Sequence, residues 1–347
     1  MRNGGAGVID LSSRGRLLLS GSEAVTFLNG LITNDMKTLA VNSWMPAAFP
    51  NVQGRLLAAV RIIHREDGFL IDTEPATQET VLKLLERYTL AGDFHVTNLT
   101  SELAMLSLQG SKSAEVLSTV LGDAATVARQ RVAMAQTADG AKVTVIRASH
   151  TAEEGFDLFV SADQAESLRD SLTNAGAQAL SADAWETLRV EAGLPLYGVD
   201  MDETNVVTET TLDDAVSFTK GCYLGQEIIA RIKYRGHVAK KLTGLILEKA
   251  TTLDAGVKVF SADDKEIGRV TSLTLSPGLG RTIALAYVKY DYLAPGTKVK
   301  IGSSAQEFPA TVAELPFIRG TWYALSEPPA DRGPQAGSPL GVVDAGG

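Results

Sequence analysis

The residues with the greatest potential for chemistry stand in one run, Lys220 to Arg231, around the only cysteine of the chain. Glycines on both sides free the backbone around Cys222. The residues that follow predict a helix from Gln226 to Lys233, so Cys222 would lie just before a helix N-terminus, with Lys220 two residues away. Both features stabilise a thiolate, so we expect a reactive thiol at Cys222, assisted by Lys220. The alternative is a small packed hydrophobe, which is the commonest role of a lone cysteine.

The charge of this region is also unusual. Residues 220–241 hold six basic residues and one acidic residue, Glu227, in a chain whose formal net charge is -9. This reversal favours contact with an anion, either a ligand carboxylate or an RNA phosphate. A solvated helix end explains it equally well, because the helix dipole favours cations there.

The composition excludes several classes of protein. The 347 residues are 45% hydrophobic and 21% charged, which is typical of two or three globular domains. The acidic balance disfavours a general nucleic-acid coat protein. One cysteine can form neither an internal disulfide nor a complete iron–sulfur site, and the four histidines lack the spacing of a zinc site. With no signal-like N-terminus and no apolar run of about 18 residues, a cytoplasmic location is expected.

The texture of the sequence changes after Lys241. Before it, patterns typical of helices and strands alternate, which indicates an α+β region over residues 1–241. From Leu242 onward, short strands separated by turns predict a small antiparallel β-barrel over residues 242–326. Residues 327–347 are rich in Pro, Gly and Ala and are expected to be disordered.

Other candidate residues are weaker. No GxGxxG or Walker pattern is present, so no nucleotide-phosphate site is predicted. Four carboxylates have no visible partner and are expected on the solvated surface: Glu23, Glu74, Glu191 and Asp200.

The run from Lys220 to Arg231 closely resembles the signature of YgfZ-like proteins, a branch of the GcvT (glycine-cleavage T-protein) family that includes folate-binding proteins and mitochondrial iron–sulfur assembly factors. The resemblance covers residues 8–318. Further blocks resemble motifs of the family: Phe27–Asp35, Asn51–Arg55, Leu106–Gly110, Arg189–Gly198, Ile267–Ser272 and Pro295–Thr297.

This resemblance implies a three-module cloverleaf around a central funnel, in which residues 1–241 form two interleaved α/β modules and the third module is the barrel. It also implies that tetrahydrofolate, or a formyl or methylene derivative, binds in the funnel. Flat apolar walls and a few polar groups would hold its ring system. Asp157 is the nearest match to a glutamate that contacts the pterin in T-proteins. The folate-binding residues expected from the resemblance are Asn29, Asp157, Tyr223, Gln226, Glu227 and Arg231.

One departure separates the branches of the family. Aminomethyltransferases carry a pair of Asp residues after the glycine turn, and alignment on Asn51 and Gly54 places Ala58 and Ala59 there. Alanine cannot polarise a folate nitrogen or hold a water molecule. The sequence therefore favours a protein that is not an active aminomethyltransferase.

The resemblance instead suggests a tetrahydrofolate-binding accessory protein for iron–sulfur cluster assembly or repair, with tRNA-modifying enzymes among its clients. Its partners would be reduced folate, iron–sulfur proteins or assembly factors, and tRNA through the basic segment Lys220–Lys241, with no membrane contact. The alternative is a folate-dependent one-carbon (aminomethyl) transferase of the glycine-cleavage type. A third interpretation is a binding module without chemistry, in which Cys222 is only packed.

Overall fold

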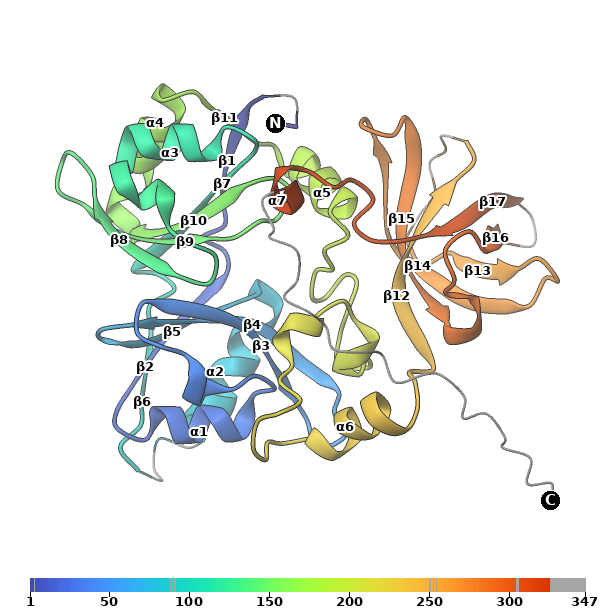
Figure 1. Cartoon of the computed structure of the whole chain (residues 1–347), viewed down its shortest axis with the longest axis horizontal. Helices are drawn as coiled ribbons and strands as arrows, with labels where there is room; N and C mark the ends of the chain where they lie inside the picture. The colour runs from blue at the N-terminus through green and yellow to red at the C-terminus, as the bar shows by residue number, and fades with distance from the viewer. Residues whose placement is uncertain are drawn as a thin grey trace, which may run out of the picture.

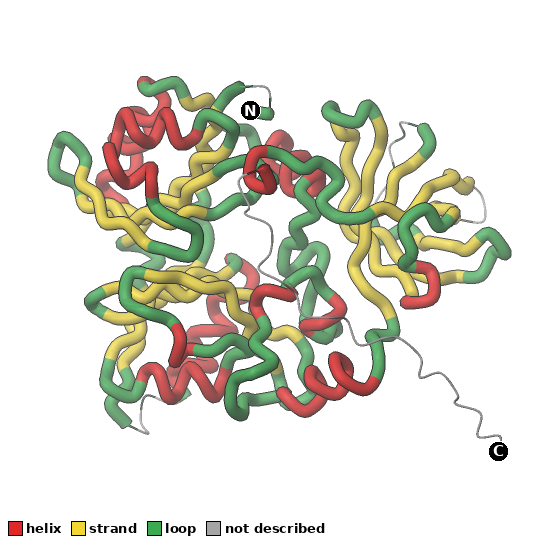
Figure 2. Tube along the Cα trace, viewed as in Figure 1, coloured by secondary structure: helices red, strands yellow, loops and turns green. Residues whose placement is uncertain are grey.

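Three modules make up the structure, a computed structural model that describes residues 1–324 except 3, 88, 90, 91, 250, 252, 254, 304 and 305. Two mixed modules, each built on one sheet, are stacked on one another, and a closed barrel lies beside them (Figures 1 and 2). The two mixed modules are interleaved in the sequence. Strand β1 (Ala6–Asp10) belongs to the second module, whereas β2 (Gly15–Ser20) already belongs to the first.

The first module is a five-stranded sheet in the order β3-β4-β5-β2-β6, covered on one face by α1 and α2. Alternate residues of β4, among them Ala58 and Val60, join the apolar core under these helices, while Arg61 points to the opposite face. Its remaining elements are β3 (Ser43–Pro50), β4 (Leu56–Arg65), β5 (Gly68–Thr73), β6 (His95–Asn98), α1 (Ala24–Leu31) and α2 (Gln78–Glu86).

The second module is a six-stranded sheet in the order β11-β1-β7-β10-β9-β8, covered by α3 and α4. On β10, Phe156 and Leu158 join the core under the helices, so Asp157 and Phe159 face the other way. Its remaining elements are β7 (Leu103–Gln109), β8 (Val132–Gln136), β9 (Lys142–Arg147), β10 (Gly155–Ser161), β11 (Ala177–Ala179), α3 (Ser113–Leu121) and α4 (Ala165–Asn174).

The two sheets face one another, with their helices on the outside (Figure 1). An apolar cluster joins them: Ile63 and Leu70 come from the first module, and Met105, Ile146 and Phe159 come from the second. Polar side chains that point into this layer are thereby removed from water and need partners there.

The barrel is reached through α5 (Ala182–Glu191), a long irregular segment and α6 (Gln226–Arg235). It closes in the order β12-β15-β14-β13-β16-β17 with antiparallel neighbours throughout, around an apolar interior that includes Val259 and Ile301. Its strands are β12 (Lys240–Leu247), β13 (Lys258–Ser261), β14 (Glu266–Ser276), β15 (Arg281–Lys289), β16 (Lys298–Ser303) and β17 (Gln306–Ala313). After β17 the chain returns to the second module, where the last described element is α7 (Thr321–Ala324).

The predicted fold class is confirmed: the chain is α+β with a closed antiparallel C-terminal barrel. The domain limits expected from the sequence stay predictions, and the tail at 327–347 lies outside the described residues. Within the described part of the chain, no helix is long and apolar enough to cross a membrane. The cytoplasmic location stays a prediction from the sequence.

Candidate functional site

A chain of alternating charges runs through the layer between the two sheets. Arg61 on β4 pairs with Asp157 on β10, so this ion pair joins the two modules. Arg61 also donates to Asp72 on β5 at 2.8 Å. Arg14 donates to both oxygens of Asp72 at 2.8 Å and pairs with Glu74 at 2.6 Å. Because each buried carboxylate contacts at least one guanidinium, the charges remain compensated away from water.

His150 is the last member of this series of charged side chains. Its Nε2 atom lies 2.9 Å from Oδ2 of Asp157. Burial would raise the pKa of Asp157, but the charges of His150 and Arg61 and the hydroxyl of Ser107 lower it well below its usual range. Asp157 is therefore ionised at neutral pH, and it fixes the direction of the imidazole ring of His150.

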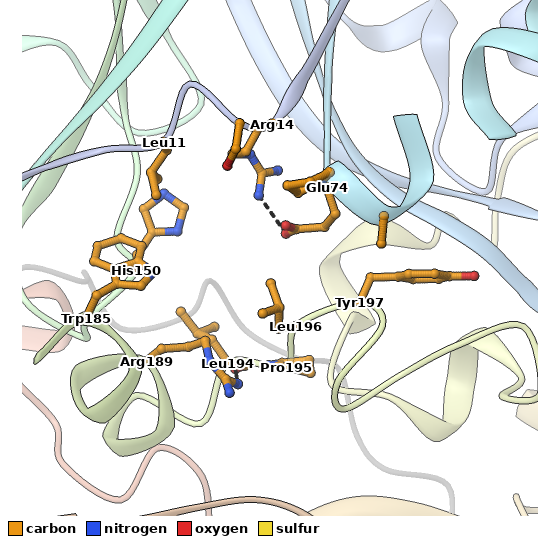
Figure 3. Close-up of a pocket in the computed structure, with 13 residues that line it drawn as sticks. Leu11, Arg14, Glu74, His150, Trp185, Arg189, Leu194, Pro195, Leu196 and Tyr197 are labelled. Carbon is orange, nitrogen blue, oxygen red and sulfur yellow. Dashed lines mark hydrogen bonds and ion pairs between the residues drawn. The ribbon is translucent and has the colours of Figure 1, made fainter. Parts of the chain in front are cut away.

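A cavity of about 370 Å³ opens beside His150 (Figure 3). Figure 3 shows His150 and Trp185 together on one side, and Arg14 paired with Glu74 on another. The charge chain thus begins and ends at this cavity. The lining residues come from both mixed modules, from α5 and from the segment after it: Leu11, Ser13, Arg14, Glu74, Pro75, Ala76, His150, Trp185, Arg189, Leu194, Pro195, Leu196 and Tyr197.

Two aromatic side chains form parts of the wall. The ring of Trp185 lies 5.4 Å from that of His150, centroid to centroid. The hydroxyl of Tyr197 donates to the carbonyl oxygen of Leu56 at 3.2 Å, and burial, with Glu203 and Asp202 nearby, raises the pKa of Tyr197 to about 12. Tyr197 is thereby kept neutral and fixed in place, so it offers a flat apolar surface.

Arg189 on α5 holds the rest of the wall. Its guanidinium donates to the carbonyl oxygen of Leu194 at 2.7 Å and to Asp200 at 2.6 Å. Asp200 in turn accepts from the backbone N–H of Leu196 at 2.9 Å. Asp200 also accepts from two barrel hydroxyls, those of Thr271 and Ser272. The cavity wall from Leu194 to Tyr197 is therefore anchored to α5 and to the barrel at once.

Of the residues predicted for the site, Asp157 contacts His150, which in turn lines the cavity. The segment from Lys220 to Arg231 contributes no residue to the cavity lining within the described chain. Tyr223 packs in an apolar cluster that also contacts Tyr197, so this segment supports the wall from behind. Burial raises the pKa of Tyr223 to about 12.

The ammonium group of Lys220 is directed to backbone oxygens rather than to Cys222. Its ammonium group donates to the backbone oxygens of Asn29, Ile32 and Asn34 at 2.7 to 2.8 Å, so it satisfies carbonyl groups at the end of α1. Burial lowers the pKa of Lys220 to about 8. Cys222 is exposed.

The other predicted residues are spread over the surface and the core. The side chain of Asn29 is buried and accepts from the backbone N–H of Met36 at 3.0 Å. Gln226 begins α6, on which Glu227 and Arg231 are exposed. The structure does not bring these four residues together with Asp157.

The two alanines face opposite sides of β4. Ala58 is completely buried in the core beneath α1 and α2, so no side chain at this position reaches the centre of the molecule. Ala59 lies on the inner face, next to the cluster that contains Tyr197. The aligned pair therefore includes only one position that faces the centre.

Sequence reasoning missed His150, Arg61 and Trp185. Asp157 and His150 are seven residues apart across the β9–β10 connection, and Arg61 belongs to the other module, so no local pattern joins them. A buried strand with single charged residues, such as Arg61 in the apolar run of β4, was the available signal.

Two family models match the chain: the GCVT N-terminal domain over residues 1–220, and the glycine cleavage T-protein C-terminal barrel domain over residues 240–318. The chain belongs to the GcvT family. An aminomethyltransferase of Rubrobacter xylanophilus is 34% identical over 90% of this chain and 83% of its own length. An aminomethyltransferase of Alcanivorax borkumensis is 31% identical over 90% of this chain and 86% of its own length.

A solved structure shares the fold. The glycine cleavage system aminomethyltransferase T from Bartonella henselae superposes with a TM-score of 0.82 at 22% identity, covering 92% of this chain and 88% of the other. Membership of the GcvT family, expected from the sequence, is thus confirmed, and the YgfZ-like branch stays a prediction.

The main function predicted from the sequence, an accessory protein for iron–sulfur cluster assembly, is wrong. Relatives that match about nine-tenths of the chain are named aminomethyltransferase, which supports the alternative function. The prediction came from the resemblance of Lys220–Arg231 to the YgfZ-like signature and from Ala58 and Ala59 at two aligned acidic positions. In the structure the ammonium group of Lys220 contacts backbone carbonyls at the end of α1, and Ala58 faces the core. Iron–sulfur clients and tRNA were inferred together with that function, and these relatives do not support them.

Proposed function

We propose that this protein is a tetrahydrofolate-dependent aminomethyltransferase whose folate binds in the cavity beside His150. The observation that carries the proposal is the cavity itself: aromatic and aliphatic walls meet a buried carboxylate–imidazole pair at its end. The relatives supply the class of reaction, because they match nearly the whole chain under the name aminomethyltransferase.

The residues present fit a reduced pterin. The cavity volume of about 370 Å³ falls in the range of small-molecule sites. Trp185, Leu196 and Tyr197 offer flat or apolar surface for the ring system, and the Arg14–Glu74 pair offers both a donor and an acceptor to its edge. Tetrahydrofolate supplies the nitrogen atoms that accept the one-carbon unit.

Proton transfer would need a group other than the aligned positions of β4, because the side chains of Ala58 and Ala59 cannot exchange protons. His150 and Glu74 are lining side chains of the types that act as general acids or bases. His150 is the better placed of the two, since its ring is oriented by the contact of Nε2 with Asp157. Glu74 is paired with Arg14 and is better suited to binding.

The direct test supplies an aminomethylated carrier protein and tetrahydrofolate and measures formation of methylene-tetrahydrofolate. We expect turnover by the parent protein, and a fall in kcat of about 100-fold or more for His150→Gln, which is typical of the loss of an acid–base group. An exposed control, His95→Gln, should keep full activity. The proposal fails if the parent forms no product under conditions in which an authentic aminomethyltransferase does.

A further inference from the structure

The loop that carries His150, residues 148–154, is held in an unusual conformation. Ala152 has a φ of +64°, a left-handed conformation that is unfavourable for a residue with a Cβ atom. Within the second module the start of the loop is fixed by Gln109, whose side chain accepts from the backbone N–H of His150 at 2.9 Å. The end of the loop, Ala152 to Glu154, is buried. The second module itself holds Glu154, through Arg147 and the backbone N–H of Gly110, but the carbonyl of Ala152 and the carboxylate of Glu153 take partners from elsewhere.

Those partners come from residues 314–324, which we call the C-terminal strap. The strap leaves the barrel after β17 and crosses to the second module (Figure 1). The backbone N–H of Trp322 donates to the carbonyl oxygen of Ala152 at 3.2 Å. The backbone N–H of Thr321 donates to the carboxylate of Glu153 at 2.9 Å. The strap thus pairs with the loop about 170 residues earlier in the chain.

One hydroxyl group has a double role in this contact. Oγ1 of Thr321 donates to Oε2 of Glu153 at 2.8 Å and accepts from the backbone N–H of Glu154 at 2.9 Å. A hydroxyl side chain can do both at this position, whereas valine has the same shape but neither a donor nor an acceptor. Loss of the hydroxyl would leave a buried N–H group and a buried carboxylate short of partners.

The strap approaches the loop closely at Gly320, where the absence of a Cβ atom leaves room for Glu153. A Cβ atom on Gly320 would lie 2.2 Å from Oε1 of Glu153, so any larger residue there would push the strap away from the loop. The same oxygen of Glu153 pairs with Arg2, which also pairs with Glu191 on α5. Glu153 is therefore a junction between the N-terminus, α5 and the strap.

We propose that the C-terminal strap is a positioning element for His150, with Thr321 as its key residue. By clamping Glu153 and Glu154, Thr321 fixes the loop between His150 and β10, and so sets the place of His150 between Asp157 and Trp185. The functional consequence of this inference rests on the proposed folate site, whereas its structural part does not. The strap thereby influences the geometry of a cavity that it does not line.

The test uses the full chain and compares Thr321→Val with Thr321→Ser. The first readout is the position of the His150 imidazole resonances by NMR, which are shifted by the nearby ring of Trp185 and are assigned by their absence in His150→Gln. The second readout is the Kd for tetrahydrofolate. Thr297→Val is a matched control, because its hydroxyl bonds only within a barrel turn, to Ala294.

We expect Thr321→Val to move the His150 resonances away from their parent positions and to raise the Kd by about tenfold. Thr321→Ser and Thr297→Val should match the parent in both readouts. If Thr321→Val fails to fold, Gly320→Ala tests the same contact by displacing the strap. Unchanged His150 resonances in a folded Thr321→Val or Gly320→Ala protein would overturn the proposal. If the resonances move but no variant, including the parent, binds folate, the positioning role stands and the proposed function fails.

Discussion

At the scale of single residues, the account depends on Asp157, a carboxylate without exposed surface that links both mixed modules to the cavity. Its partners Arg61 and His150 come from different modules, so Asp157 has a structural and a functional role at once. Removal of its charge leaves Arg61 short of one partner, although Asp72 still contacts Arg61. We expect Asp157→Asn to lower the free energy of unfolding at pH 7 by about 3 kcal/mol, because it breaks a buried ion pair.

The same substitution predicts a change in pH dependence. Burial alone would raise the pKa values of Asp157 and Asp72, but neighbouring cations lower both below the unfolded value of about 4. Such groups stabilise the fold fully above about pH 4, and this stabilisation is lost as the pH falls further, toward their folded pKa values. Urea unfolding between pH 7 and pH 2.5 should show a less steep loss of stability for Asp157→Asn than for the parent. Parallel pH profiles would contradict this assignment.

At the scale of secondary-structure elements, the position of α6 depends on one glycine. Gly225 precedes the helix with a φ of +78°, and a Cβ atom there would lie 2.3 Å from the backbone oxygen of Asn51. The start of α6 therefore rests directly on the turn between β3 and β4. Gly225→Ala should destabilise the protein by about 2 kcal/mol, from the left-handed conformation and the steric overlap together. Gly221→Ala is the matched control, because its Cβ would have open space, and thermal unfolding compares the two. Equal melting temperatures would contradict this role of Gly225.

Local sequence signals predicted the presence of a helix more accurately than the residues at which it begins and ends. The helix predicted from Gln226 to Lys233 is present as α6 and extends to Arg235. Asp183 and Glu186 have the spacing of a capping box, yet the first turn of α5 is capped by Ser181, whose side chain accepts from the N–H of Ala184. Periodicity is a property of many residues, whereas a cap depends on one hydrogen bond, and several nearby polar residues can form it.

At the scale of the whole molecule, sequence reasoning failed where partners are distant along the chain. Asp200 and Glu191 were expected on the solvated surface, yet both are buried. Asp200 bonds to barrel hydroxyls more than 70 residues away, and Glu191 accepts from Ser276 of the barrel. Carboxylates look alike in a sequence whether they face water or a partner, so burial of this kind follows only from the tertiary arrangement. The fold class was predictable because the strands and turns of the barrel, and the alternating helices and strands of the mixed modules, leave local patterns in the sequence.

The same argument explains the candidate site. Asp157 was named only from its resemblance to a family glutamate, and its contact with folate stays a prediction. The cavity beside it is built from segments as far apart as Leu11 and Tyr197. The distinctive run around Cys222 drew attention because of its composition, although its lysine serves the end of α1. The unusual local composition around Cys222 therefore belongs to a contact between α1 and the segment before α6, and the cavity is lined by other residues.

The central claim is that reduced folate binds in the cavity beside His150, and isothermal titration calorimetry with tetrahydrofolate tests it most directly. The account predicts binding by the parent protein with a Kd in the micromolar range, about -8 kcal/mol. Trp185→Ala removes a wall of the cavity and should raise the Kd at least about tenfold, whereas Arg231→Ala, an exposed change on α6, should leave it unchanged. No binding by the parent at about millimolar ligand, or a loss of affinity in Arg231→Ala but not in Trp185→Ala, would contradict the account.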